Sequence, residues 1–110
     1  MSRAKKKPLE FLGDALASLR EFPGEARREA GYQLDRTQTG EDPTHYRPMP
    51  SVGRGVVEIK IREDDGAFRV FYVANRGNAI YVLHCFQKKS QKTDKQDIEI
   101  GKKRYSEIPD

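Results

Sequence analysis

Residues 56–89 read VVEIKIREDDGAFRVFYVANRGNAIYVLHCFQKK, and this stretch decides the fold of the chain. Three runs within it are rich in Val, Ile, Phe and Tyr, which suit a pleated strand: 56–62, 68–74 and 79–87. Asp65-Gly66 separates the first two runs and 75–78 separates the last two, and both are typical turn sequences. The stretch therefore predicts a three-stranded antiparallel sheet.

The first turn predicts which side chains share a face of this sheet, because side chains alternate between faces along a strand. With a two-residue loop at 65–66, Arg62 is expected opposite Arg69. One face is then apolar and carries Val57, Ile59, Ile61, Phe68, Val70, Tyr72, Tyr81, Leu83 and Cys85. The other carries Glu58, Lys60, Arg62, Arg69, Phe71, His84, Phe86 and Lys88.

The second face is unusually cationic for a strand surface. Two arginines directly opposite each other repel, and a bound polyanion would offset that repulsion. Aromatic side chains among cations favour single-stranded nucleic acid, although each cation could equally be a solvated outer-face residue. The candidate RNA-binding residues are Arg62, Phe71, Phe86, Lys89 and Lys92.

Composition agrees with a basic surface on one small domain. The chain has 110 residues, 35% of them charged, and a net charge of +4. Residues 47–92 carry nine basic and four acidic residues, so the positive excess lies in the sheet segment. With no membrane-length apolar run and a lone Cys85, we expect a cytoplasmic protein with Cys85 in its core.

The remaining segments predict an α+β domain over residues 8–110 after a basic tail at 1–7. Residues 8–12 suggest an edge strand, and helices are expected at about 14–22, 25–37 and 94–107. Thr93 and Gln96 fit a capping box for the last helix, and 41–55 suggests a connecting loop. The two-helix hairpin is expected to cover the apolar face and to leave the cationic face open.

The cationic face suggests chemistry that needs no metal or other cofactor. The chain has no spaced zinc-ligand set and no glycine-rich phosphate loop. A cationic surface can cleave RNA by activating a 2′-hydroxyl against its adjacent phosphate, which requires a base, a charge stabiliser and an acid. The candidate catalytic residues are Lys60, Arg69, His84 and Lys88, with no role assigned to each by spacing.

The chain resembles the RelE/ParE superfamily of bacterial toxins, in particular its HigB-like, phage-derived branch, over about residues 7–108. The segments that carry the resemblance are 7–9 with 12–13, 22–23, 58–60, 68–72 and 81–90. Lys60 and Arg69 match the family's basic strand positions, Lys88 and Lys89 match its basic pair, and Arg62 is a looser match. Val57 and Thr93-Asp94 depart from the common pattern of the branch.

The resemblance implies a strand, a two-helix hairpin, a three-stranded antiparallel sheet and a C-terminal helix. It also implies a toxin of a type II toxin–antitoxin module that cleaves messenger RNA on the ribosome, inhibited by a helix-turn-helix antitoxin. Two alternatives stay open. The chain could be a toxin that binds a protein target such as DNA gyrase, or an inactive phage remnant.

Overall fold

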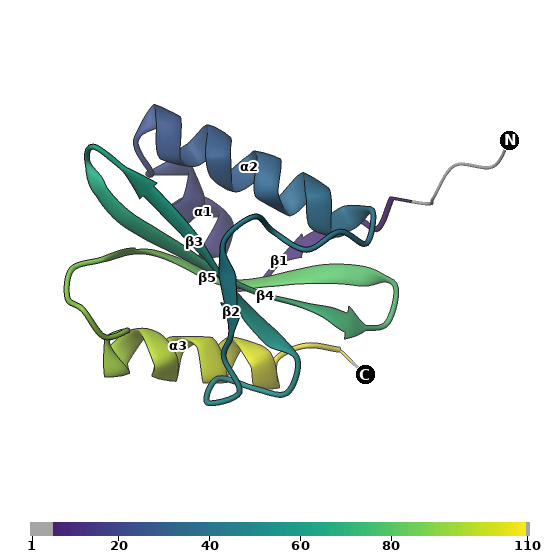
Figure 1. Ribbon diagram of the computed structural model, residues 1–110. Coiled ribbons are helices and arrows are strands. Elements are labelled where there is room, and N and C mark those ends of the chain that lie inside the picture. Colours follow the sequence, from purple (N-terminus) through teal and green to yellow (C-terminus); the bar gives the residue numbers. More distant parts are fainter. Residues whose placement is uncertain (1–5, 110) are drawn as a thin grey trace, which may run out of the picture.

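The computed structural model describes residues 6–109, which form one mixed sheet with helices on both faces (Figure 1). Helices α1 and α2 lie on one face and α3 lies on the other. In chain order the elements are β1 (Leu9–Phe11), α1 (Ala15–Arg20), α2 (Gly24–Gln38), β2 (Tyr46–Pro48), β3 (Val56–Glu63), β4 (Gly66–Arg76), β5 (Ala79–Lys88) and α3 (Lys95–Ser106). The expected α+β class and the three helices are confirmed.

The sheet has five strands in the order β1-β5-β4-β3-β2, so the expected three-stranded sheet was too small. The predicted edge strand at 8–12 is confirmed as β1, which pairs parallel to β5. The additional strand β2 lies inside the expected loop and pairs antiparallel to β3. Only three residues long and ending in Pro48, β2 has too little alternation to be recognised from its sequence.

The first hairpin turns one residue earlier than expected. Glu63 pairs with Gly66, which leaves Asp64 and Asp65 as the loop. Lys60, not Arg62, therefore lies opposite Arg69. The expected faces survive this error, because both registers place the same parity of residues on each side of the β3–β4 pair.

A β-bulge in β5 corrects the expected faces of that strand. Phe71 pairs with His84 but the next residue, Tyr72, pairs with Val82, so Leu83 is the extra residue. Leu83 and Tyr81 consequently pack on the α3 side of the sheet, opposite to the expectation. Cys85 lies two residues after Leu83 and pairs with Val70, and its predicted place in the core under α1 and α2 is confirmed.

The sheet separates two apolar cores, where the sequence suggested one. The first joins strand residues to Leu19 and Phe22 of the α1 segment and to Leu34 of α2. The second joins the opposite face to α3 and the residues after it, and its buried members are Met49, Val52, Val56, Phe71, Val73, Leu83, Phe86 and Ile108. The expectation of a fully open cationic face was therefore wrong, since α3 covers one end of it.

Gly101 lets α3 approach the sheet closely. A Cβ atom built at this position would lie 2.8 Å from Val52 Cγ1 and 2.9 Å from Phe71 Cδ2. Gly101 is buried, and the Phe71 ring occupies the space that a side chain at position 101 would need. A helix-disfavouring residue in the middle of α3 thus has a packing reason.

Two further expectations concern the basic tail and the start of α3. Residues 1–5 of the expected basic tail lie outside the described residues, whereas Lys6 pairs with Asp35 at 2.5 Å and Lys7 Nζ donates to the Ala74 carbonyl at 3.0 Å. The α3 N-cap is Asp94, whose Oδ1 accepts from the Gln96 amide at 2.9 Å. Within residues 6–109 no helix is long and apolar enough to cross a membrane.

Candidate active site

Three parallel rows of side chains cross the face of the sheet that α3 partly covers. Strand pairing defines each row, because directly opposed residues point to the same side. The first row is Arg47, Glu58, Phe71 and His84; the second contains Lys60, Arg69 and Phe86; the third is Arg62, Ala67 and Lys88. The first row lies beneath α3, and the second and third rows lie successively closer to the open end of the face.

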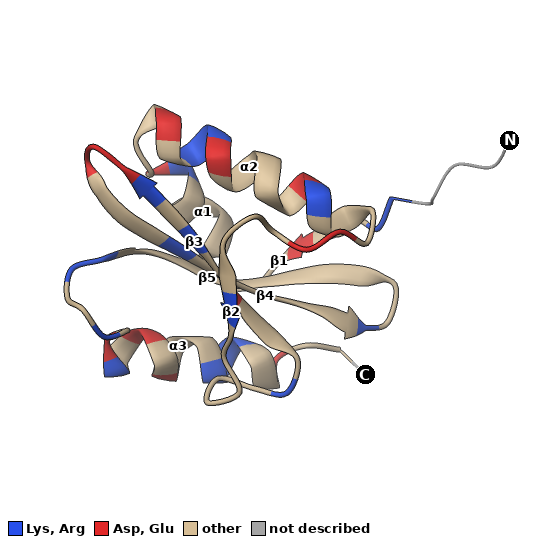
Figure 2. Ribbon diagram, viewed as in Figure 1, with Lys and Arg blue, Asp and Glu red and all other residues tan. Residues whose placement is uncertain are grey.

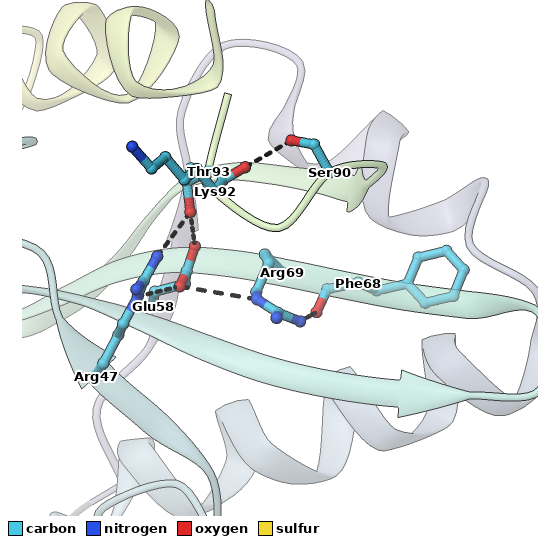
Figure 3. A network of polar contacts seen from close by, with 7 residues as sticks. All are labelled: Arg47, Glu58, Phe68, Arg69, Ser90, Lys92 and Thr93. Atoms are coloured by element: carbon cyan, nitrogen blue, oxygen red, sulfur yellow. Dashed lines mark hydrogen bonds and ion pairs between the residues drawn. The ribbon is translucent and has the colours of Figure 1, made fainter. Parts of the chain in front are cut away.

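A buried carboxylate organises the first row. Glu58 is completely buried, and its Oε1 accepts a hydrogen bond of 2.8 Å from Arg47 Nε (Figure 3). Thr93 Oγ1 donates to Glu58 Oε2 at 3.0 Å and accepts from Arg47 Nη2 at 2.8 Å. The three side chains thereby tie β2, β3 and the segment before α3 together. Thr93 serves this network and not the capping box that its sequence suggested.

His84 lies in the same row and belongs to the packing of α3. Its Nε2 is 2.8 Å from Asp97 Oδ1 on α3, and its ring stacks on Phe86 with centroids 4.8 Å apart. The side chain is buried between the sheet and the helix. His84 lines neither of the two cavities described below, so the structure does not bring it together with Lys60, Arg69 and Lys88, and its catalytic role stays a prediction.

Arg69 is the central cation of the second row and is only 7% exposed. Its Nη1 donates to the Phe68 carbonyl at 3.0 Å (Figure 3). Its Nε lies 3.7 Å from Glu58 Oε1, an ion pair too long for a hydrogen bond, and that buried N–H has no hydrogen-bond partner among residues 6–109. Burial lowers the pKa of Arg69, but a guanidinium remains charged in proteins. Arg69 is thus a buried cation with hydrogen-bonding capacity left over.

Two adjoining cavities open over the second and third rows, and Arg62 and Arg69 line both of them. The larger has a volume of about 480 Å³ and is lined by Arg62, Ala67, Arg69, Lys88, Lys89, Ser90 and Gln91. The other has a volume of about 360 Å³ and is lined by His45, Lys60, Ile61, Arg62 and Arg69. We call these two adjoining cavities together, with Lys60, Arg62, Arg69, Lys88 and Lys89 as their basic residues, the cationic trough.

The trough lowers the pKa of one of its own lysines. Partial burial is the largest cause that lowers the pKa of Lys88. The positive charges of Arg69, Arg47 and Lys60 lower this pKa further, and the negative charge of Glu58 opposes them. A lysine with a lowered pKa is more often neutral and can accept a proton. Lys88 therefore has the electrostatic setting of a base, beside cations that can hold a phosphate.

The structure brings together most of the basic residues selected from the sequence. Lys60, Arg62, Arg69, Lys88 and Lys89 all line the trough, and Lys92 lines a smaller cavity beside it that shares Lys88 and Lys89. Figure 2 shows basic positions on the strands and along the loop that joins β5 to α3. Phe71 has no exposed surface and Phe86 is buried, so neither offers a ring for base stacking, contrary to expectation.

Sequence reasoning missed the residues that support the trough from below. Arg47 and Thr93 are far from Glu58 along the chain and meet it only through strand β2 and the approach to α3. The one available signal was Glu58 itself, an acidic residue on an otherwise cationic face. Its charge is explained by the two arginines beside it, Arg47 and Arg69.

Comparison with known protein families identifies the family of the chain. A family model described as phage-derived protein Gp49-like (DUF891) matches residues 17–106, from α1 to the last residue of α3. The chain belongs to the Gp49-like family. No curated protein matches it. The Gp49-like match covers all the basic residues of the trough and the network around Glu58. In residues 6–109 of this Gp49-like protein, no group of three or more His, Cys, Asp or Glu is placed to hold a metal ion.

Proposed function

We propose that this Gp49-like protein is the toxin of a type II toxin–antitoxin module and that it cleaves messenger RNA on the ribosome. The observation that carries the proposal is the cationic trough with Arg69 at its centre. Arg69 lines both cavities of the trough, and the carboxylate beside it is shared with Arg47. Phosphate oxygens are the ligands that a guanidinium fork recognises best.

The charge balance around Arg69 also favours an anionic ligand. Lys60 lies directly opposite Arg69 on the neighbouring strand, and like charges in that position destabilise a sheet. Glu58 is the buried counter-ion, but it is shared with Arg47. A bound phosphodiester would relieve the remaining repulsion among the basic residues of the trough.

The proposed reaction is attack of a ribose 2′-hydroxyl on the adjacent phosphate, without a protein-bound metal. Lys60, Arg62 and Arg69 would stabilise the negative charge of the phosphorane, and Lys88 would act in proton transfer. Lys89 and Lys92 would hold the flanking backbone of the RNA. Electrostatic attraction to phosphates is independent of sequence, so recognition of particular codons would come from the ribosome-bound message and not from the trough alone.

Inducing the wild-type chain and the variants Lys60→Ala, Arg69→Ala and Lys88→Ala in the bacterial cytoplasm tests this proposal. Primer extension of transcripts after induction should show new RNA ends with the wild type and few or none with the variants. Growth arrest with intact transcripts and an SOS response would point to a toxin acting on DNA gyrase. Growth without arrest would indicate an inactive phage remnant.

We further propose that a helix-turn-helix antitoxin inhibits the toxin through its basic surface. Acidic residues of such a partner would be attracted to the trough, which would speed association and make it sensitive to salt. Measuring the association rate of purified toxin and antitoxin between low and high salt tests this, with a marked fall expected. Equal rates across the salt range would contradict an electrostatic contact.

A further inference from the structure

We propose that His45 is the general acid of the cleavage reaction and that Lys88 is its general base, with Arg62 and Arg69 holding the phosphate between them. This inference rests on the proposed function and deepens it by assigning the two proton transfers. It concerns His45, which the sequence placed only in a connecting loop and which none of the preceding catalytic assignments includes.

Strand pairing brings His45 to the edge of the trough. His45 directly precedes β2, and the Lys60 amide donates to the His45 carbonyl at 2.8 Å. Because Tyr46 pairs with Ile59, continuing the register places His45 opposite Lys60 and on the same face. His45 therefore extends the second row outward, so that His45, Lys60 and Arg69 follow one another across three neighbouring strands.

The backbone on either side of His45 is held in place. The amide of Thr44 donates to Gln33 Oε1 at 2.8 Å, and Gln33 Nε2 donates to Thr44 Oγ1 at 3.1 Å. Gln33 is a buried residue of α2 and thus a firm anchor. With Lys60 bonded to its carbonyl, His45 lies on a fixed segment and presents an exposed imidazole to the cavity that it shares with Lys60, Arg62 and Arg69.

Accessibility separates the two histidines of the chain. His84 is buried and engaged with Asp97 of α3, whereas His45 is exposed at the trough. Histidine is the side chain that most often serves as a general acid or base in enzymes. The other basic groups that line the trough are lysines and arginines, and arginine does not release its proton in proteins. His45 is therefore the best-suited proton donor that the trough offers.

The two cavities place His45 and Lys88 on opposite sides of the arginines. Arg62 and Arg69 line both cavities, His45 lines one of them, and Lys88 lines the other. In-line displacement at phosphorus requires the attacking and leaving oxygens to lie on opposite sides of the phosphate. A base at one end of the trough and an acid at the other match that requirement, with the arginines at the phosphate itself.

The reaction balances without any further reactant. Lys88 in its neutral form accepts the 2′-hydroxyl proton while the 2′-oxygen forms a bond to phosphorus. The bond from phosphorus to the 5′-oxygen breaks, and the imidazolium of His45 gives that oxygen its proton. The products are a 2′,3′-cyclic phosphate and a 5′-hydroxyl end, and the arginines stabilise the charge of the phosphorane between them.

Single-turnover cleavage of a ribosome-bound message by wild type, His45→Gln and the neighbouring control Tyr46→Phe tests the assignment. Two messages are compared, one with the natural 5′-oxygen and one with sulfur at that bridging position, because a thiolate leaves without needing an acid. We expect His45→Gln to cut the natural message at least about 100-fold more slowly than wild type. It should cut the sulfur-containing message within a few-fold of wild type, and Tyr46→Phe should match wild type on both.

The outcomes distinguish the inference from the function on which it rests. No cleavage of either message by wild type would overturn the proposed function. Cleavage by wild type with an unchanged His45→Gln rate on the natural message, or with equal losses on both messages, would overturn the role of His45 alone. Cleavage of the sulfur-containing message by His45→Gln would also show that the variant is folded, so its slow cleavage of the natural message could not be a folding defect.

Discussion

Oε1 of Glu58 lies 3.7 Å from Nε of Arg69, close enough for charge neutralisation and too far for a hydrogen bond. Glu58 is fully buried, and its hydrogen bonds to Arg47 and Thr93 hold the carboxylate on the side away from Arg69 Nη1. The carboxylate therefore stabilises the buried guanidinium without occupying its donors. This geometry keeps Arg69 folded into the sheet and leaves it able to bind an anion.

Glu58→Gln should destabilise the fold, because it removes the buried negative charge between two arginines. We expect the free energy of unfolding to fall by about 2–4 kcal/mol, since breaking a buried ion pair leaves uncompensated charge. Urea denaturation followed by circular dichroism measures the change. Glu99→Gln on the exposed side of α3 is the matched control and should change stability by less than about 0.5 kcal/mol. Equal effects would refute the network's structural role.

Gly101→Ala and Gly31→Ala should have opposite effects on stability, although both lie within helices. A Cβ atom at Gly101 meets Val52 and Phe71 within 3 Å, whereas at Gly31 it meets nothing within 4 Å. Overpacking should cost Gly101→Ala about 1–3 kcal/mol, and helix propensity should stabilise Gly31→Ala by up to about 1 kcal/mol. Thermal melts of both variants check this, and a stabilised Gly101→Ala would mean that α3 does not press on the sheet.

The single thiol should be unreactive until the chain unfolds. Burial in the core raises the pKa of Cys85 to about 12, so hardly any thiolate exists near neutral pH. With Ellman's reagent at pH 8, native protein should show almost no reaction and protein in guanidinium chloride should show one thiol per chain. Rapid stoichiometric labelling of native protein would contradict this burial.

Cleavage of the sulfur-containing message should become faster with rising pH as Lys88 loses its proton. Burial and the neighbouring cations lower the pKa of Lys88 from its ordinary 10.5, so the neutral, proton-accepting form appears at lower pH than in a solvated lysine. Single-turnover rates on the message with sulfur at the bridging position, which needs no acid, should therefore rise from pH 6 to 9.5. Lys88→Arg keeps the charge but cannot accept the proton, and should be at least about 100-fold slower without this rise. A Lys88→Arg variant with the wild-type profile would exclude Lys88 as the base.

Asp97→Ala should loosen α3 and leave the chemistry of the trough in place. The substitution removes the 2.8 Å contact with the buried His84, which we expect to cost about 1–3 kcal/mol of stability. Urea denaturation measures that loss, and cleavage rates per folded molecule should stay close to wild type well below the melting transition. A large loss of activity in folded Asp97→Ala would restore His84 as a candidate for proton transfer.

The sequence was most informative where local pattern and local chemistry coincide. Alternating apolar residues and turn residues predicted β3, β4 and β5, and helical spacing predicted all three helices. The basic residues of the trough were found because strand alternation places Lys60, Arg62, Arg69 and Lys88 on one face of these strands. The predicted assignment of side chains to faces remains correct despite the one-residue error in the β3–β4 turn, since that error moves no side chain to the other face.

The sequence by itself determined the α+β class, the three central strands and which of their cations share a face, because these follow from periodicity within short segments. Only the tertiary structure decided what covers that face. The bulge at Leu83, the packing of Gly101 against Phe71, and the meeting of Arg47, Glu58 and Thr93 all depend on residues far apart in the chain. Such contacts leave no periodic pattern in the sequence. They decide that His84 is buried and that His45 is exposed.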